Sequence, residues 1–290
     1  MIKKLFFLII LIILITSCSF QNNKKLKIST STWIGYSPLY YAKEKGWLEP
    51  LNIKLLNVVS LSENMYLYKA GNSDAYVGTQ YEYSFLNKEN LIPIIMFDKS
   101  NGGDIVMANY SIDDLLKIET KIDVYLEMDS INSIVFNDFI KQYNLTNKQF
   151  NYINKDQSFI SKLKNSETPT IIVTYNPYNI NLEKEGFKEI TSTKSNENIA
   201  VVDAMFTTRE LFNENKDRFI ELKKILDKSI ENLKQNPKEY FDTVKAYLPD
   251  MIFEDFEKSL NDIMWINKQI PEKLNEKLNN SNFPTKDILK

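Results

Sequence analysis

The sequence predicts an α/β protein of two units, and three observations support this fold class. From residue 26 onward, short runs of β-branched and apolar residues alternate with stretches of 3.6-residue helical periodicity. The alternation occurs in two successive blocks, and beyond residue 202 the pattern becomes almost purely helical. Each block can form one α/β unit, and the helical tail is expected to pack on one of them. A chain of 290 residues with 43% hydrophobic residues can supply cores for both units.

The first block contains four expected strands and two expected helices. Ser37 and Pro38 are typical of the cap and first residue of a helix, and Gly46 is placed to end it. Ser62 and Gly71 bracket the second helix in the same way. Such βα units predict parallel strands with helices on both faces of the sheet. The expected strands are 26–32, 53–59, 74–78 and 91–97.

The second block repeats this scheme with five expected strands. Asp129 or Ser130 is expected to cap a helix that runs to Tyr143, and 158–164 is expected to form a shorter helix. In the tail, Pro237 is suited to be the first residue of a helix. The expected strands are 105–108, 121–126, 150–153, 170–174 and 187–191, and the expected helices of the tail are 209–234, 237–248 and 253–269.

The composition excludes several classes of function. The formal net charge is -2, which argues against a nucleic-acid partner, because phosphate-binding domains usually carry a basic excess on one face. The chain has no histidine, which excludes His-ligated metal sites, catalytic triads with a His base and His pH switches. Its single cysteine excludes disulfides and thiolate metal clusters. We therefore expect no metal and no cofactor.

Residues 1–17 have the features of a secretory signal peptide. Lys3 and Lys4 precede an apolar run over 5–15, and small residues follow this run. Spanning a bilayer takes about 20 apolar residues, so a permanent transmembrane helix is the weaker interpretation. Export would place the rest of the chain outside the cytoplasm.

Cys18 is the only cysteine of the chain, and it follows Ile15, Thr16 and Ser17. This pattern resembles the lipobox of bacterial lipoproteins. The resemblance implies cleavage before Cys18 and acylation of its thiol and amine, and several acyl chains anchor a protein firmly. The polar residues 18–25 would then be a flexible tether. The alternative is that Cys18 is only a small apolar residue at the end of a signal peptide.

Aromatic residues follow two of the expected strands at the end where ligands bind in open parallel sheets. The loop after the first strand carries Trp33, Gly35 and Tyr36. Tyr175 and Tyr178 follow a buried strand of the second block. We expect these rings to contact a ligand. The alternative for the first loop is that its rings only cover the edge of the sheet.

Two acids are the candidate charged groups of the site. Gln80, Tyr81 and Glu82 follow the strand 74–78. Glu82 is either a ligand contact or an ordinary first-turn acid favoured by the helix dipole. Asp203 interrupts an apolar run that is expected to cross between the two units. Burial of an acid is unfavourable unless it is paired, so Asp203 is either a hinge acid bonded to backbone amides or a ligand contact.

Together the candidate residues predict binding rather than catalysis. Ser130 at a helix start is a weaker candidate, with a plain helix cap as its alternative. The set supplies aromatic rings, amides, hydroxyls and two acids, but no pair of a nucleophile and a base. Rings with carboxylates favour a cationic or heteroaromatic ligand. The alternative is a carboxylate-dependent hydrolase that uses Glu82 and Asp203 as acid and base.

Several motifs occur in an order and spacing that point to a known family. They are STWIGYSPLYYA at 31–42, AGNSDA at 70–75, DIVMA at 104–108, TYNPY at 174–178 and IAVVD at 199–203. In this order they resemble the nitrate, sulfonate, taurine and thiamine-precursor group of periplasmic substrate-binding proteins. The resemblance covers essentially the whole chain after the signal peptide. It implies a type II periplasmic-binding-protein fold, with two lobes joined by a hinge and the C-terminal helices packed on the first lobe.

The resemblance also implies boundaries and a function. The first lobe would comprise 26–104 and 201–290, and the second lobe 105–200. The protein would be a monomer on the periplasmic face of a bacterial membrane, anchored by lipid on Cys18. It would capture a small organic molecule in the interlobe cleft and deliver it to an ABC permease with its ATPase. An extracytoplasmic ligand sensor for a signalling partner is the alternative, and catalytic activity is not expected.

Overall fold

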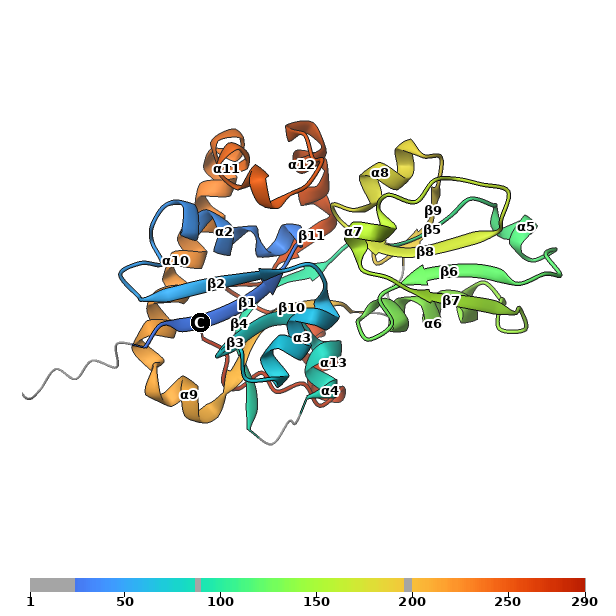
Figure 1. The fold of residues 1–290 in the computed structure, drawn as a ribbon. Coiled ribbons are helices and arrows are strands. Elements are labelled where there is room, and N and C mark those ends of the chain that lie inside the picture. The colour runs from blue at the N-terminus through green and yellow to red at the C-terminus, as the bar shows by residue number, and fades with distance from the viewer. Residues whose placement is uncertain (1–23, 87–89, 196–199, 290) are drawn as a thin grey trace, which may run out of the picture.

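The chain folds into two α/β lobes that lie side by side, each built around its own sheet (Figure 1). The computed structural model describes residues 24–86, 90–195 and 200–289. We call lobe 1 the part with the six-stranded sheet, of order β11-β4-β10-β3-β1-β2, and lobe 2 the part with the five-stranded sheet, of order β7-β6-β8-β5-β9. The predicted signal peptide, Cys18 and most of the predicted tether lie outside the described residues.

The sheet of lobe 1 is mixed rather than parallel. β1 pairs in parallel with β2 and β3, whereas β10 runs antiparallel between β3 and β4, and β11 pairs antiparallel with β4. The four strands predicted in the first block all run in one direction, but β10 and β11 run the opposite way, so the prediction of a purely parallel sheet is wrong. The reason is that β10 enters from lobe 2 and not through a βα crossover, so no connection forces it to be parallel. The strands are β1 (Leu26–Ser31), β2 (Ile53–Val58), β3 (Ala75–Thr79), β4 (Leu91–Ser100), β10 (Val202–Thr208) and β11 (Ile263–Trp265).

The sheet of lobe 2 is also mixed. β6 pairs in parallel with β7 and β8, and β5 runs antiparallel to β8 and β9. The five strands predicted for this block are confirmed, with ends that differ by one residue at most. They are β5 (Asp104–Ala108), β6 (Ile122–Leu126), β7 (Phe150–Asn154), β8 (Thr170–Tyr175) and β9 (Lys188–Ser192).

Several predicted helix starts need correction. Ser60 caps α3 by accepting the backbone N–H of Glu63, so Ser62 is not the cap. Neither Asp129 nor Ser130 caps α6, which begins after Ile131 without a side-chain cap. Ser37 is already inside α2. The short helices of the two lobes are η1 (Ile34–Tyr36), α2 (Ser37–Glu44), α3 (Leu61–Lys69), α4 (Gln80–Phe85), α5 (Ile112–Leu115), α6 (Asn132–Gln142), α7 (Gln157–Ile160) and α8 (Asn179–Lys184).

The C-terminal tail returns to lobe 1, where α10 and α11 pack on α2 (Figure 1). Pro237 begins α11, as predicted. The predicted helix 209–234 is divided at Asn215, and the predicted helix 253–269 ends at Ser259, because the chain then joins the sheet edge as β11. The elements are α9 (Arg209–Glu214), α10 (Lys216–Gln235), α11 (Pro237–Val244), η2 (Lys245–Tyr247), α12 (Phe253–Ser259), η3 (Leu260–Asp262) and α13 (Glu272–Asn280).

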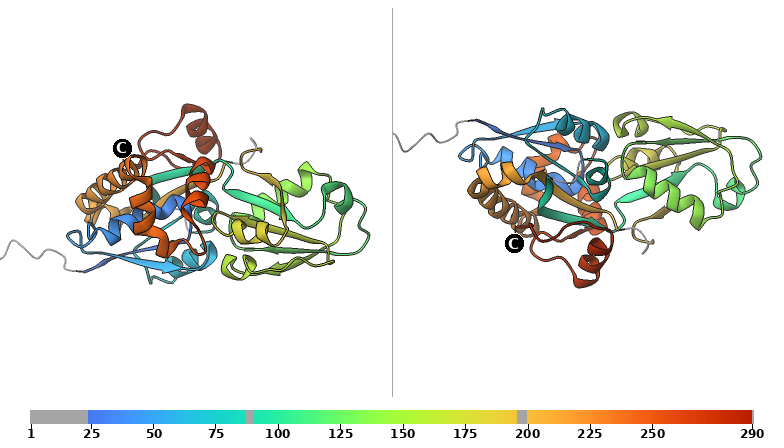
Figure 2. Two further views of the ribbon diagram at one scale, coloured as in Figure 1. Left: turned by 90° about the horizontal axis from the view of Figure 1, so that it is seen from above. Right: turned by 90° about the horizontal axis from the view of Figure 1, so that it is seen from below.

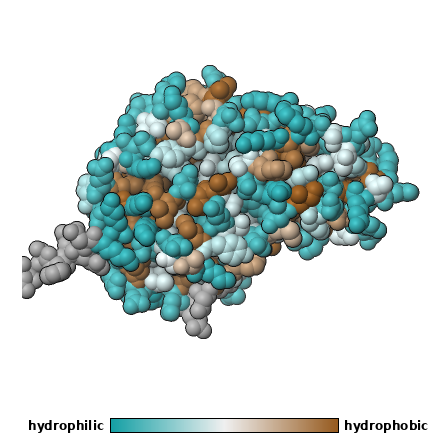
Figure 3. All heavy atoms as spheres, viewed as in Figure 1, coloured by the Kyte–Doolittle hydropathy of each residue, from teal (hydrophilic) through white to brown (hydrophobic). Residues whose placement is uncertain are grey.

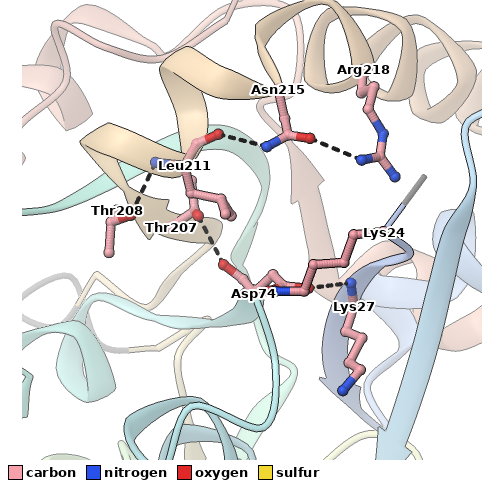
Figure 4. Close-up of polar contacts among 8 residues, drawn as sticks. All are labelled: Lys24, Lys27, Asp74, Thr207, Thr208, Leu211, Asn215 and Arg218. Carbon is pink, nitrogen blue, oxygen red and sulfur yellow. Dashed lines mark hydrogen bonds and ion pairs between the residues drawn. The ribbon is translucent and has the colours of Figure 1, made fainter. Parts of the chain in front are cut away.

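Asp74 fixes the end of the lobe 1 sheet that lies away from lobe 2 (Figure 4). Its carboxylate accepts the backbone N–H of Lys27 at 2.8 Å, and its carbonyl oxygen accepts the hydroxyl of Thr207 at 2.9 Å. Next to Thr207, Thr208 caps α9 by accepting the N–H of Leu211 at 3.2 Å. One acid thus ties the beginnings of β1 and β3 to the end of β10.

Two chain segments connect the lobes, one between β4 and β5 and one between β9 and β10 (Figure 2). The hydroxyls of Ser100 and Thr193 lie 2.8 Å apart, and Thr193 Oγ1 also accepts the N–H of Gly102 at 2.8 Å. These bonds join the two connecting segments to each other. The two connecting segments, which form the hinge, are therefore hydrogen-bonded to each other.

The surface carries apolar residues scattered among hydrophilic ones on the face shown in Figure 3. Several large apolar side chains are exposed, including those of Tyr66, Phe85 and Met128. Among the described residues, no helix has both the length and the apolar character needed to cross a membrane.

Lobe 1 has a second, smaller hydrophobic core that contains Tyr76, Tyr83, Phe206 and Phe283. Replacing Phe206 by Ala tests its contribution to stability. Phe206 is fully buried on β10, and its ring packs against those of Tyr76, Tyr83 and Phe283 at centroid distances of 5.0, 5.2 and 6.0 Å. Loss of a buried Phe side chain typically costs about 3–5 kcal/mol. We expect Phe206→Ala to lower the free energy of unfolding, measured by urea titration, by about that amount. The matched control is Phe85→Ala, because Phe85 is 52% exposed; an equal effect of the two changes would contradict the prediction.

Candidate functional site

Side chains from both lobes meet at a small cavity between the two sheets. Its volume is about 10 Å³, no more than a single water molecule needs. Lobe 1 contributes residues around η1, α3, β3 and β10, and lobe 2 contributes the first residue of β5 and the last residue of β8. The lobes are therefore closed on each other. The lining residues are Trp33, Tyr36, Leu61, Thr79, Asp104, Tyr175, Val201 and Asp203.

Trp33 is held at this cavity by a buried acid. Its indole Nε1–H donates to Asp98 Oδ1 at 3.3 Å, and Asp98 on β4 is fully buried. A Cβ atom on Gly35 would lie 2.0 Å from Asp98 Oδ2, and a Cβ atom on Gly103 would lie 2.3 Å from the Trp33 ring. Both positions therefore require glycine. The two glycines make room for the carboxylate and the indole between neighbouring backbone segments.

The rings of both lobes enclose the cavity. Tyr36 donates its hydroxyl to Asp203 Oδ1, and both side chains are buried. The pairing of β10 with β3 places Asp203 opposite Thr79. On the other side, Tyr175 stands edge-on to Trp33 with ring centroids 6.0 Å apart. The Tyr175 hydroxyl is buried and has no hydrogen-bond partner within the described parts of the chain.

Burial raises the pKa of each acid around the cavity. Desolvation raises the pKa of Asp98 to about 8 and that of Asp104 to about 7. The pKa of Asp203 is raised well above its ordinary value, first by burial and then by the charge of Asp98. No Lys or Arg in the described ranges contributes to these three shifts. The cavity is therefore acidic and lacks an internal counter-charge.

Two glutamates make reciprocal contacts between the lobes, and we call this pair the glutamate clasp. Glu82 on α4 of lobe 1 accepts the N–H of Ile131 at 2.9 Å, just before α6 of lobe 2. Glu127, which follows β6 of lobe 2, accepts the N–H of Leu61 at 3.2 Å, at the start of α3 in lobe 1. Each carboxylate thus lies at a helix N-terminus of the opposite lobe, where unpaired N–H groups and the helix dipole favour negative charge.

Both oxygens of Glu82 are engaged by the protein. Besides Ile131, Glu82 accepts the N–H of Thr79 at 2.8 Å and completes a capping box at the start of α4. The interpretation of Glu82 as a first-turn acid of a helix is therefore confirmed, and this carboxylate is not part of the cavity lining. Glu127 is engaged in the same way, since its second oxygen accepts the N–H of Gln157 at 3.2 Å.

Gln80 and Ser130 support these contacts from outside the cavity. The Gln80 side chain donates to the carbonyl of Ala200 and accepts the N–H of Val202 at 2.8 Å, so it holds the segment that leads into β10. Ser130 donates its hydroxyl to the carbonyl oxygen of Glu127 at 2.9 Å. Both side chains are thus bonded to backbone rather than directed at the cavity.

Two further predicted residues, Tyr81 and Tyr178, also lie outside the lining. Tyr178 packs edge-on against Tyr175 with centroids 5.5 Å apart, behind the ring that faces the cavity. Tyr81 is half-buried, and its ring packs against that of Phe85 with centroids 4.7 Å apart. Of the predicted residues, the structure brings Trp33, Tyr36, Tyr175 and Asp203 together at the cavity, with Gly35 beside Asp98.

Sequence comparison shows the family to which this arrangement belongs. The model of the family described as NMT1/THI5 like matches residues 33–240. The chain belongs to the NMT1/THI5-like family. No curated protein matches the chain.

Solved structures confirm the fold of this NMT1/THI5-like chain. The ligand-binding component of an ABC-type import system from Staphylococcus aureus, with zinc bound, matches with a TM-score of 0.71, 13% identity and coverage of 91% of this chain and 96% of that chain. The aliphatic sulphonate-binding protein SsuA of Escherichia coli matches with a TM-score of 0.64, 11% identity and coverage of 90% and 89%. A Candida albicans protein with the generic periplasmic binding protein fold matches with a TM-score of 0.66, 13% identity and coverage of 91% and 92%.

The predicted fold class and family resemblance are therefore confirmed, and the chain has the periplasmic-binding-protein fold. Within the described ranges, no group of three or more His, Cys, Asp or Glu side chains is placed to hold a metal ion. The acids around the cavity of this NMT1/THI5-like chain are therefore not arranged as a metal site.

Sequence reasoning missed Asp98, Asp104 and Glu127 as site residues. Each of them stands at the end of a strand that the pattern predicts correctly, directly after 91–97 or 121–126 or directly before 105–108. Asp203 was singled out because it interrupts an apolar run. The related signal of an acid next to a predicted apolar strand, applied to every strand, finds all three residues.

The acids of the cavity predict an unusual pH dependence of stability. The pKa values of Asp98 and Asp104 are raised from 3.8 to about 8 and about 7, so the folded chain binds more protons than the unfolded chain between these values. Stability therefore falls as the pH rises through this range, by up to about 1.4 kcal/mol per pH unit for each acid. We expect urea titrations to give a lower free energy of unfolding at pH 8 than at pH 6.

The control for this experiment is a pair of isosteric variants. Asp98→Asn removes one of the titrating groups and should flatten the decline between pH 6 and pH 8. Asp113→Asn, at an exposed position on α5, should leave the slope unchanged. A stability that rises over this range in the unaltered chain would contradict the assignment.

Proposed function

We propose that the chain is a lipid-anchored receptor that captures a small organic molecule between its lobes and delivers it to an ABC permease with its ATPase. The observation that carries this proposal is the cavity lined from both lobes, by Trp33 and Asp203 on one side and Asp104 and Tyr175 on the other. A ligand that contacts both sides stabilises the closed arrangement over the open one.

The printed descriptions of similar proteins support this role. The Staphylococcus aureus protein is a ligand-binding component of an ABC-type import system, and the Escherichia coli protein binds aliphatic sulphonates. Membership of the NMT1/THI5-like family agrees with a binding rather than a catalytic role. We therefore propose a periplasmic binding protein without enzymatic activity, cofactor or metal, acting as a monomer.

The contacts indicate which of the predicted residues bind the ligand and which act elsewhere. Trp33, Tyr36, Tyr175 and Asp203 contact the ligand, because they line the cavity. Of the predicted residues outside the lining, Glu82 acts on lobe closure through its bond to Ile131. Gln80, Tyr81, Ser130 and Tyr178 contact groups next to the junction of the lobes. The proposed lobes are 26–104 with 201–290, and 105–200. The second boundary falls in the segment between β9 and β10, whereas the first falls one residue inside β5, whose Asp104 belongs to the sheet of lobe 2.

The experiment that tests the receptor is native mass spectrometry of the full chain purified in detergent, with small-angle X-ray scattering to follow closure. We expect a small organic molecule to co-purify, and its removal by dialysis under denaturing conditions followed by refolding to increase the radius of gyration. Trp33→Ala should lower the occupancy at least tenfold, since it removes the largest ring at the cavity. Tyr110→Ala is the control, because Tyr110 follows the end of β5 opposite to Asp104 and does not line the cavity. A rigid chain that retains no molecule in either form would refute the receptor.

The lipid anchor has its own test. Cys18 is the only cysteine, so Cys18→Ser removes the only thiol that can be acylated. We expect the unaltered chain, expressed in a bacterial host, to fractionate with membranes and to carry acyl groups detectable by mass spectrometry of its N-terminal peptide. Cys18→Ser should lack this modification. An unmodified chain that starts at any residue other than 18 would contradict the proposal.

A further inference from the structure

Around the cavity, hydrogen-bond acceptors outnumber the donors that remain unused. The indole N–H of Trp33 is used by Asp98 Oδ1, and the hydroxyl of Tyr36 is used by Asp203 Oδ1. The raised pKa values of Asp98 and Asp203 keep these carboxyls largely protonated without a cation, and a bound cation favours their ionised form, in which a carboxylate is an acceptor only. A ligand that satisfies them must bring N–H or O–H donors.

Two buried polar atoms lack a partner within the described ranges, one on the lining residue Tyr175 and one on Asp98, which is bonded to Trp33 and lies outside the lining. Asp98 Oδ2 and the Tyr175 hydroxyl are both buried, and neither has a hydrogen-bond partner among the described residues. Asp98 is 0% exposed and Tyr175 is 2% exposed, so water does not compensate them freely. An unpaired polar atom in such a position destabilises the folded chain, and a bound donor would offset this cost.

The acidic side chains of the site also favour a cationic ligand. Burial, and then the charges that Asp98 and Asp104 carry when they ionise, raise the pKa of Asp203, so the three acids oppose each other's ionisation. No ion pair of the described residues includes any of these three acids. An anionic ligand would add to this repulsion, whereas a cation would relieve it. The rings of Trp33 and Tyr175 also favour a cation, since their faces carry negative potential.

We propose that the ligand is an organic cation with N–H donors, such as an ammonium or amidinium group, and that Asp98 and Asp203 select its charge. This inference rests on the proposed function as a receptor. Because the closed cavity holds about 10 Å³, the lobes separate to admit the cation and close around its charged group. Neutral molecules of the same shape leave the carboxylates uncompensated and bind more weakly.

The test uses compounds that share one ring and differ in charge: benzamidinium, benzamide and benzoate. Binding to the full chain in detergent is measured at pH 7.5 by isothermal titration calorimetry. We expect benzamidinium to bind at least tenfold more tightly than benzamide, with no binding of benzoate. Asp98→Asn and Asp203→Asn should each weaken benzamidinium at least tenfold, and the exposed control Asp113→Asn should not.

Each other outcome overturns the inference. If benzamide or benzoate binds as well as benzamidinium, and Trp33→Ala abolishes that binding, the receptor stands and the cationic ligand is wrong. If none of the three compounds binds, the cationic ligand is also wrong, whereas the receptor is judged by the co-purified molecule. If benzamidinium binds equally to both carboxylate variants, Asp98 and Asp203 do not select the charge. Two variants are used so that the test survives if one does not fold, as judged by circular dichroism.

Discussion

The burial of carboxylates where the lobes meet is the constraint on which the rest of the structure depends. Five acids are buried in this region: Glu82, Asp98, Asp104, Glu127 and Asp203. They make no ion pair within the described ranges. Backbone N–H groups donate to both glutamates, the Trp33 indole donates to Asp98 and the Tyr36 hydroxyl donates to Asp203. Those donors come from both lobes, so the closed arrangement is also the one in which the glutamates are satisfied. Stability and closure therefore involve the same groups.

The acids divide into two kinds by the number of bonds that they make. The glutamate clasp is fully engaged, because each of its carboxylates accepts N–H groups with both oxygens. Asp98 keeps one oxygen without a partner, although it positions Trp33 with the other. A protein that only needed to close would have no use for the second kind. The division thus separates the glutamates, whose oxygens are all bonded across or beside the junction of the lobes, from Asp98, which keeps one oxygen without a partner in the described part of the chain.

Local pattern predicted most of the fold but not the pairing of its strands. The strands of both blocks stand out because β-branched and apolar residues cluster at short intervals between caps and glycines. β10 was missed, since its sequence continues directly into α9 and its role depends on neighbours far away in the chain. Trp33, Tyr36 and Tyr175 could be named from the sequence because they follow predicted strands, and Asp203 because it interrupts an apolar run. The engagement of Glu82 with Ile131, and of Glu127 with Leu61, could not, because it arises only when two lobes face each other.

The reciprocal geometry of the glutamate clasp bears on how the two halves move. Each carboxylate exchanges water for the amide of the opposite half, and the two exchanges occur at separate points of the junction. A half-open intermediate would strip solvent from both acids without yet supplying their new donors. Such intermediates are therefore disfavoured, and the molecule is expected to switch between two discrete states rather than drift through a continuum.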